Sequence, residues 1–326
     1  MRKERQLTLR RAAFRCLTKI IEIPIGIFER PKITEHGKTP GEYSPVFIVG
    51  APRTGSTILY QVLTNRFDVL YMDNLIDLFF RNLYFGFWLS KKMFHGKPHN
   101  SFGSDFGNTL LDGLRAPSEC GGFWLQWLPK YRDFVEGHEL SEEDIQRMAC
   151  RIHAVINRHK KTFIIKNLNN GQRMQVLSKV FPSAKVIFIK RDPVQAAQSI
   201  LLARKSLKIH AKDWWSVKPK NHAELMSLGE TERTIKQIYY IEKQISKDAL
   251  LFPKENFLTV HYEDLCARSH QTLEKIHRFM GEGTKHRDPG SMPDLNLNQD
   301  QKMTDKDLNK IKEIVNQLDW ENYANK

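Results

Sequence analysis

The chain has 326 residues, 40% of them hydrophobic, and its 51 basic residues outnumber 37 acidic ones to give a net charge of +14. That length is sufficient for a large core in one domain or at most two. The four cysteines form no C-x-x-C pair, which argues against a cysteine zinc site and a disulfide framework and favours a reducing, cytoplasmic compartment. The excess of positive charge implies an anionic partner, whether nucleic acid, membrane surface or polyanionic small molecule.

Residues 1–30 combine a series of arginines and lysines with apolar residues between them. Glu22 and Pro24 interrupt the apolar stretch, which argues against a secretory signal. The chain contains no run of about 18 apolar residues that would predict a transmembrane helix. The pattern favours a helix packed on the domain with a solvated basic face. A helix lying on an anionic membrane surface and a mitochondrial presequence stay open as alternatives.

After this arm, short apolar runs alternate with helical patterns. Residues 31–45 are rich in proline, glycine and polar groups and predict a linker, so we divide the chain into a basic arm and linker (1–44) and a domain (45–326). The apolar runs are continuous, as expected for strands buried on both faces, and lie at 46–50, 162–166, 185–190 and 257–262. We therefore predict an α/β, P-loop-like three-layer fold: a central parallel sheet flanked by helices, with helical insertions and an N-terminal helical arm.

Further helices are expected between and after these strands. The aromatic-rich segment 75–94 predicts a buried helix, and a long helix is expected across much of 221–250. Ser141 and Thr304 each precede a helical pattern and have an aspartate three residues later, which is typical of helix N-caps.

The turn after the first predicted strand is GAPRTGST, residues 50–57, and its spacing resembles the nucleotide P-loop G-x-x-x-x-G-K-[ST]. Its two glycines let the backbone curl so that N–H groups point inward, and the following helix adds its positive end, which suits a phosphate or sulfate. Ser56 stands where a nucleoside triphosphatase has its lysine, and a cation is found instead at Arg53. The loop therefore keeps anion binding without the triphosphate apparatus; a simple tight turn is the alternative.

A second anion site is indicated at the end of the third predicted strand, beside Arg191. Ser199 follows by eight residues, slightly more than two helical turns, so both side chains can face one side of a helix. An arginine can bind a phosphate bidentately while a serine hydroxyl adds a further hydrogen bond. Taken alone, the pair is also consistent with a surface arginine and a helix-interior serine.

Three segments together resemble the sulfotransferase family that uses 3′-phosphoadenosine-5′-phosphosulfate (PAPS). PVFIVGAPRTGSTIL is similar to the family's 5′-phosphosulfate loop, IFIKRDPVQAAQSI to its 3′-phosphate motif, and VHYEDLCARSHQTLEKIHRFMG to its Tyr-Glu-Asp-Leu segment. They occur in the family's order. The resemblance implies an enzyme that moves a sulfuryl group from PAPS to a hydroxyl or amine. It assigns the 5′-phosphosulfate to Arg53, Thr54, Gly55, Ser56 and Thr57, and the 3′-phosphate to Arg191 and Ser199.

Sulfuryl transfer needs a base for the acceptor's proton and positive charge for the sulfuryl group and the leaving phosphate. Arg53 is in place for the leaving group. Lys166 ends the second predicted strand, at the edge where open α/β sheets bind ligands, and family members commonly have a lysine there. Because these two cations supply the charge, we expect no metal in the reaction.

The base departs from the cytosolic branch of the family, which has a histidine two residues after that lysine. Leu168 occupies this position, so the resemblance points to the branch with a glutamate base. Glu119 is the candidate, with Asp105 and Asp112 as weaker alternatives. Ile58 stands where the cytosolic branch has a tryptophan, so adenine must stack on another residue.

The acceptor is not determined by these motifs: a small molecule, a lipid, a glycolipid and a carbohydrate all stay open. A lipid would connect the aromatic segment with the basic arm. A P-loop kinase is a second hypothesis, although it would require a lysine at position 56. A nucleic-acid-binding protein would account for the charge, but no nucleic-acid motif occurs, so nucleic acid is not an expected partner. A sulfotransferase fold that binds nucleotide without turnover is the fourth hypothesis, and the oligomeric state stays open.

Overall fold

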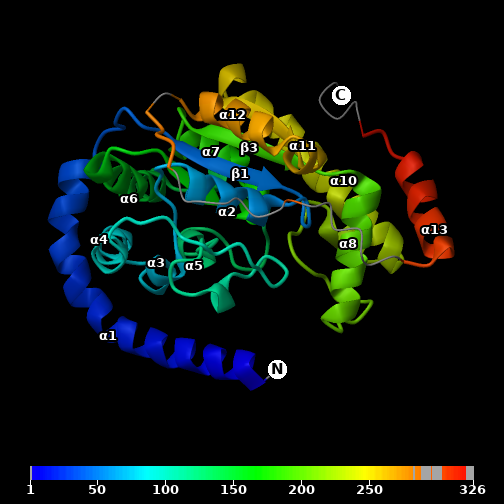
Figure 1. Ribbon diagram of the computed structural model, residues 1–326, viewed down its shortest axis with the longest axis horizontal. Coiled ribbons are helices and arrows are strands. Elements are labelled where there is room, and N and C mark those ends of the chain that lie inside the picture. The colour runs from blue at the N-terminus through cyan, green and yellow to red at the C-terminus, as the bar shows by residue number, and fades with distance from the viewer. Residues whose placement is uncertain (1, 282, 288–294, 296–302, 321–326) are drawn as a thin grey trace.

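A parallel β-sheet forms the centre of the molecule. The computed structural model describes residues 2–281, 283–287, 295 and 303–320, with side chains described from residue 20 onward. In this part of the chain the sheet has four strands in the order β2-β1-β3-β4, and all neighbours are parallel. Figure 1 shows the sheet among the helices, with β1 and β3 labelled. The strands are β1 (Pro45–Gly50), β2 (Phe163–Lys166), β3 (Lys185–Lys190) and β4 (Phe257–His261). They agree with the predicted runs to within one residue, which confirms the α/β prediction.

Helices cover both faces of this sheet, because successive strand residues point to opposite sides. In β1, Phe47 and Val49 belong to the core shared with α6 (Glu142–His159), α7 (Met174–Val180) and α10 (Glu230–Asp248). Val46 and Ile48 belong to a second core shared with α2 (Ser56–Arg66) and α12 (Ser269–Met280). Both faces of the sheet are buried, which explains why the strand sequences are continuous apolar runs. The three-layer prediction is confirmed.

Side-chain caps fix where several helices begin. Ser141 accepts a hydrogen bond from the main-chain N–H of Asp144 at the start of α6. Thr304 does the same for Asp307 at the start of α13 (Asp305–Asn316), so both N-cap predictions are confirmed. α13 packs against α8 (Pro193–Ser206) and α10, which joins the end of the described chain to the domain.

Two predicted helices are each broken into two. The aromatic segment 75–94 forms α3 (Asn74–Leu78) and α4 (Leu83–Phe94), because the chain turns after the N–H of Phe79 closes α3 on the carbonyl of Ile76. The predicted helix within 221–250 becomes α9 (His222–Leu225) and α10, which starts only after Gly229. At the first break apolar residues continue across the turn, from Phe79 and Phe80 to Leu83, so the pattern alone does not mark it.

The remaining elements are short. The α-helices are α5 (Gly121–Trp124) and α11 (Tyr262–Ala267). The 3₁₀ turns are Leu110–Asp112, Gly137–Glu139, Leu168–Gln172, Ala249–Leu251 and Lys254–Asn256.

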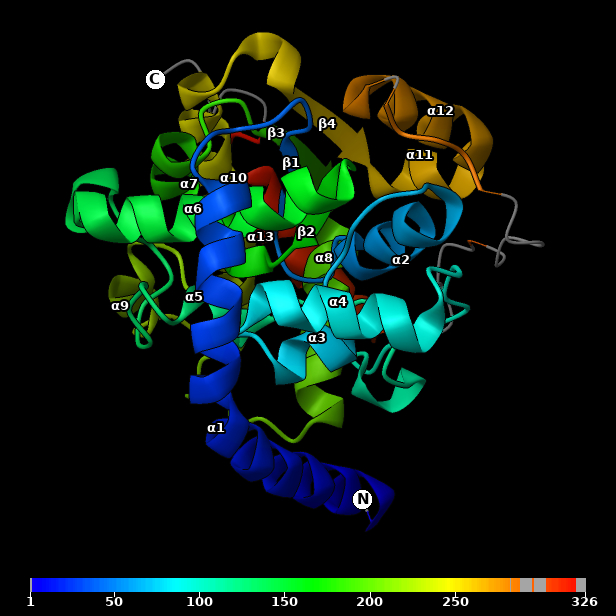
Figure 2. The same ribbon diagram turned by 90° about the vertical axis from the view of Figure 1, so that its left-hand side faces the viewer.

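The N-terminal arm is one long helix, α1 (Arg2–Gly37), which packs along α6 and α4. The predicted linker is therefore wrong over its first part: the helix continues through Pro31, and its non-helical remainder starts after Gly37. Buried Glu29 anchors α1, since it accepts hydrogen bonds from the side chain of Asn82 and the main-chain N–H of Phe85. The first turns of α1 run beyond the body of the domain (Figure 2). None of the described helices combines the length and apolar character needed to cross a bilayer.

Candidate active site

A cavity of about 1320 Å³ opens where β1, β2 and β3 end. Such a position is expected, because ligands of open α/β sheets bind outside the carboxyl ends of the strands. All but one of the predicted site residues line it: Arg53, Gly55, Ser56, Thr57, Glu119, Lys166, Arg191 and Ser199. The structure thus brings together side chains that lie up to 146 residues apart in the sequence, as in the contact between Arg53 and Ser199.

Thr54 differs from the other predicted loop residues. Its side chain is fully buried and donates a hydrogen bond of 2.8 Å to the carbonyl of Ala51. It does not line the cavity, so it closes the turn rather than facing a ligand. Any contact between Thr54 and a bound anion would come from its main-chain N–H.

The loop owes its shape to two residues with positive φ. Gly55 has a φ of +85° at the N-cap of α2, a conformation that glycine adopts without steric cost. Arg53 has a φ of +66°, which is uncommon for a residue with a Cβ and represents local strain of a kind found at binding sites. Gly50 is also constrained, because a Cβ there would lie 2.5 Å from the carbonyl oxygen of Ile189 on neighbouring β3.

The two predicted anion sites form one cluster. The Nε of Arg53 donates a hydrogen bond of 3.1 Å to the hydroxyl of Ser199, and Arg191 donates one of 3.1 Å to the main-chain carbonyl of Arg53. Burial and the nearby Arg191 charge lower the pKa of Arg53 below its usual value. Among the described residues, the buried Nε of Arg191 has no hydrogen-bond partner. Two neighbouring guanidinium groups with a spare donor form a site that a polyanion would satisfy.

Tyr262 supports this cluster and was not assigned a role from the sequence. Its ring lies where a Cβ of residue 55 would be, and the Arg191 guanidinium lies 4.8 Å from the ring centre, within cation–π range. Burial, together with a hydrogen bond to Cys266, raises the pKa of Tyr262 to about 12, so it stays neutral. The Tyr-Glu-Asp-Leu segment marked this tyrosine, but its contacts with the β1 and β3 ends appear only in the tertiary structure.

The candidate catalytic groups meet beside the loop. Lys166, whose side chain is only 1% exposed, forms an ion pair with Glu119 and donates a hydrogen bond of 3.1 Å to the hydroxyl of Thr57. The side-chain amide of Asn167 donates to the main-chain carbonyl of Glu119 at 3.2 Å and holds that segment. Lys166 therefore lies between the phosphate loop and a partly exposed carboxylate.

The two weaker carboxylate candidates are placed differently. Neither Asp105 nor Asp112 lines the cavity, whereas Glu119 does. Leu168 and Ile58, the two departures from the cytosolic branch, both line it. The rest of the wall includes aromatic side chains that could contact a base or an apolar acceptor: Phe102, Phe106, Tyr131, Trp215 and Tyr262.

Comparison with known proteins decides the family. The profile described as the sulfotransferase family matches residues 45–285, which contain the whole sheet and the cluster of cations. The chain belongs to the sulfotransferase family. The match starts at the first residue of β1 and leaves α1 outside it.

Individual relatives of this sulfotransferase-family chain are distant. Omega-hydroxy-beta-dihydromenaquinone-9 sulfotransferase Stf3 of Mycobacterium bovis and the protein of the same name from Mycobacterium tuberculosis are 24% identical over 256 residues. The aligned part is 73% of this chain but 63% of the length of those relatives. Sulfotransferase STF9 from Mycobacterium avium superposes with a TM-score of 0.50 at 12% identity, over 79% of this chain and 68% of that one, which confirms the fold.

Substitution of Gly55 tests how far the site depends on its contact with Tyr262. We expect Gly55→Ala to destabilise the protein by more than the cost of a positive φ alone, which is about 1–2 kcal/mol, because its Cβ also displaces the tyrosine ring. Gly96→Ala is the matched control: Gly96 also has a positive φ (+67°), but nothing lies within 4 Å of its Cβ position. Equal losses of unfolding free energy in urea for the two variants would contradict this dependence.

Proposed function

We propose that the protein transfers the sulfuryl group of PAPS to a hydroxyl group of an apolar acceptor. The observation that supports this most directly is the cluster of Arg53, Arg191 and Ser199 beside a P-loop-like turn that lacks the lysine of nucleoside triphosphatases. An adenosine nucleotide with phosphates at both the 3′ and the 5′ position has the two separated anionic groups that such a cluster and loop would bind.

In this proposal the two anionic ends of PAPS bind at two neighbouring places. The 5′-phosphosulfate lies in the loop, held by Arg53, Ser56, Thr57 and the main-chain N–H groups around Gly55, while Thr54 supports the turn from behind. The 3′-phosphate is bound by Arg191 and Ser199. The Arg53–Ser199 hydrogen bond and the Arg191–Arg53 contact couple the two sites, so each phosphate is expected to help position the other.

The transfer step is assigned to Glu119 and Lys166. Glu119 accepts the proton of the acceptor hydroxyl, whose oxygen bonds to sulfur while the bond from sulfur to the 5′-phosphate oxygen breaks, and 3′-phosphoadenosine-5′-phosphate leaves. Lys166 contacts both Thr57 on the donor side and Glu119 on the acceptor side, so its ammonium group can balance charge on the moving sulfuryl group. Arg53 stabilises the leaving phosphate, and these residues carry the step without a metal.

An apolar, lipid-like acceptor is favoured by three features. Five aromatic side chains line the cavity. The distant relatives named above act on a menaquinone-type lipid, according to their names. On α1, Ile20, Ile23 and Ile27 lie about one turn apart and are 74%, 74% and 59% exposed. We propose that this stripe contacts a membrane surface peripherally, and that the positive charge carried by residues 1–19 attracts α1 to anionic headgroups.

The cysteines bear on the cellular location of the enzyme. Cys150 and Cys266 are free thiols, which is consistent with the cytoplasm. We propose that the enzyme acts in the cytoplasm on molecules at the membrane surface.

The catalytic domain is proposed to extend over 45–326, since α13 packs on α8 and α10 although it lies beyond the family match.

Nucleotide binding tests the donor assignment. We expect 3′-phosphoadenosine-5′-phosphate to raise the melting temperature, while AMP and ATP do not; a ligand at about 100 times its Kd adds about 2.7 kcal/mol of stability. Arg191→Ala should abolish the shift. Lys205→Ala, which removes a positive charge from an exposed position on α8 outside the cavity, should retain it. Stabilisation by ATP alone would favour the kinase hypothesis instead.

Substitution of Glu119 tests its assignment as the base. A positioned general base contributes about 10²–10⁴-fold to the rate, so Glu119→Gln should lower kcat by at least about 100-fold while nucleotide-induced stabilisation is retained. Steady-state sulfation of a model alcohol with PAPS measures this. Asp105→Asn serves as the control, because Asp105 does not line the cavity. If Asp105→Asn lowered kcat as much as Glu119→Gln, the assignment would be wrong.

Vesicle flotation tests the membrane contact. We expect the full chain to float with vesicles containing anionic lipid, and the triple change of Ile20, Ile23 and Ile27 to serine to abolish this, since burying each isoleucine contributes about 1.5 kcal/mol or more. Leu250→Ser is the control, because Leu250 is 79% exposed but lies far along the chain from α1. Failure of the full chain to float would refute the contact and leave the donor assignment untouched.

A further inference from the structure

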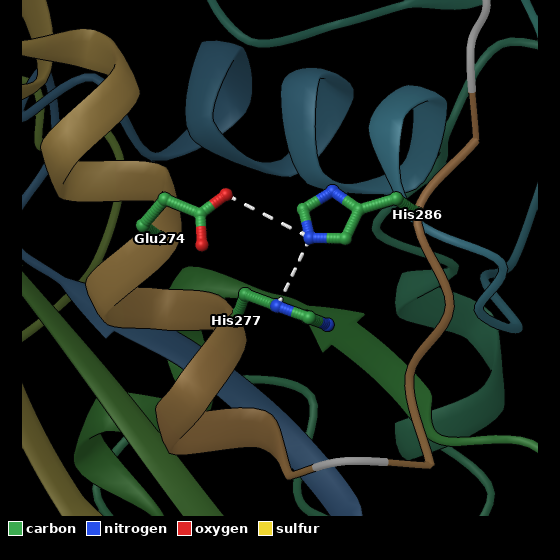
Figure 3. Close-up of side chains that lie close together, drawn as sticks. All are labelled: Glu274, His277 and His286. Carbon is green, nitrogen blue, oxygen red and sulfur yellow. Dashed lines mark hydrogen bonds and ion pairs between the residues drawn. The ribbon is translucent and has the colours of Figure 1, made fainter.

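A second group of reactive side chains lies away from the active site. Glu274 and His277 come from α12, and His286 comes from the segment that follows it (Figure 3). One ligand atom from each side chain lies within 4.8 Å of the other two. This end of α12 is near the amino end of the sheet, because Lys185, the first residue of β3, donates a hydrogen bond of 2.8 Å to the carbonyl of Phe279. The phosphate loop follows the opposite, carboxyl end of β1.

The ring of His277 is oriented by its surroundings. Its Nε2 lies 2.5 Å from the main-chain oxygen of Thr284. A carbonyl only accepts hydrogen bonds, so Nε2 carries a proton, and in the neutral form of the ring the lone pair of Nδ1 faces His286. Phe67 stacks on the His277 ring at 5.0 Å between ring centres, with 8° between the planes. Histidines that bind metals commonly donate their second N–H to a carbonyl in this way.

The distances around His286 fit a shared cation. Its Nε2 is 3.1 Å from Nδ1 of His277 and 3.7 Å from an oxygen of Glu274. One Nε2–H cannot donate well to both acceptors, whereas an ion between the three atoms would be bound by all of them. Ligand atoms of a tetrahedral zinc ion, at about 2.0–2.1 Å from the metal, are about 3.4 Å apart, close to these separations.

We propose that Glu274, His277 and His286 bind a divalent transition-metal ion of the Zn²⁺ or Co²⁺ type. Two imidazoles and one carboxylate favour such ions over Mg²⁺ and Ca²⁺, which prefer oxygen ligands only. The fourth position is left to solvent, since the His286 side chain is 52% exposed. The ion would join α12 to the segment at 283–287, so its role is to stabilise that connection and not to take part in sulfuryl transfer.

This site is compatible with the cysteine pattern that argued against zinc, because it uses no cysteine. Glu274 and His277 are three residues apart on one helix and so share a face. His286 reaches them only because the chain turns back after α12, where a bridge pairs it with Phe67. For that reason, the spacing of these residues along the sequence did not indicate the site.

Titration of the full-length protein with Co²⁺ tests the proposal. Binding is followed by visible absorption, because tetrahedral Co²⁺ is coloured. We expect one ion per chain, bound at micromolar concentrations and retained in excess Mg²⁺. Glu274→Gln and His286→Ala should each weaken binding by at least about tenfold, since even changes to groups that only orient ligands cost that much. His270→Ala is the matched control, because it removes an exposed histidine from the same helix.

A second measurement separates loss of the site from loss of the fold. Zn²⁺ should raise the melting temperature of the wild type and of His270→Ala, but not of His286→Ala, and all variants should keep the wild-type circular dichroism spectrum. The proposal is overturned if the wild type binds no Co²⁺ at micromolar concentrations, or if Glu274→Gln and His286→Ala bind as tightly as the wild type. It is also overturned if His270→Ala weakens binding as much as they do.

Discussion

The close approach of the Tyr262 ring to Gly55 is the contact on which the candidate active site depends. Gly55 ends the phosphate loop in a left-handed conformation, and the tyrosine occupies the space that any larger residue would fill. The same ring lies against Arg191, which in turn donates to the carbonyl of Arg53. The loop after β1, the end of β3 and the segment after β4 are thereby held together.

That arrangement has an electrostatic consequence. Arg53 and Arg191 are partly buried side by side, and burial together with the Arg191 charge lowers the pKa of Arg53. A guanidinium nevertheless keeps its proton, so the site holds concentrated positive charge that a dianionic phosphate relieves. Lys166 is buried more deeply but is balanced by Glu119. Positive charge is therefore concentrated on the side of the cavity with the two arginines, whereas Lys166 on the other side is paired with a carboxylate. The proposed transfer from an anionic donor to a neutral hydroxyl would require this distribution.

The two ends of the sheet have different groups of functional side chains beside them. The carboxyl end has the strained loop, the arginines and the cavity. The amino end has the Glu274, His277 and His286 cluster, supported by Phe67 at the end of α2. Because α2 begins at the P-loop-like turn and ends at this cluster, a stabilising ion at one end would support the helix whose N-terminus forms part of the proposed anion site at the other.

The sequence by itself determined the strands, the order of strand and helix, and the identity of the loop residues, because each depends on local patterns: continuous apolar runs, glycines at fixed spacing, capping side chains. It also favoured Glu119 over Asp105 and Asp112 as the base, which stays a prediction. Only the tertiary structure decided that Glu119 pairs with Lys166 while Asp105 and Asp112 lie outside the cavity, that Thr54 faces inward, and that α1 continues past Pro31. These outcomes depend on packing between residues distant in the chain, as does the position of His286 beside α12, and no local pattern encodes such contacts.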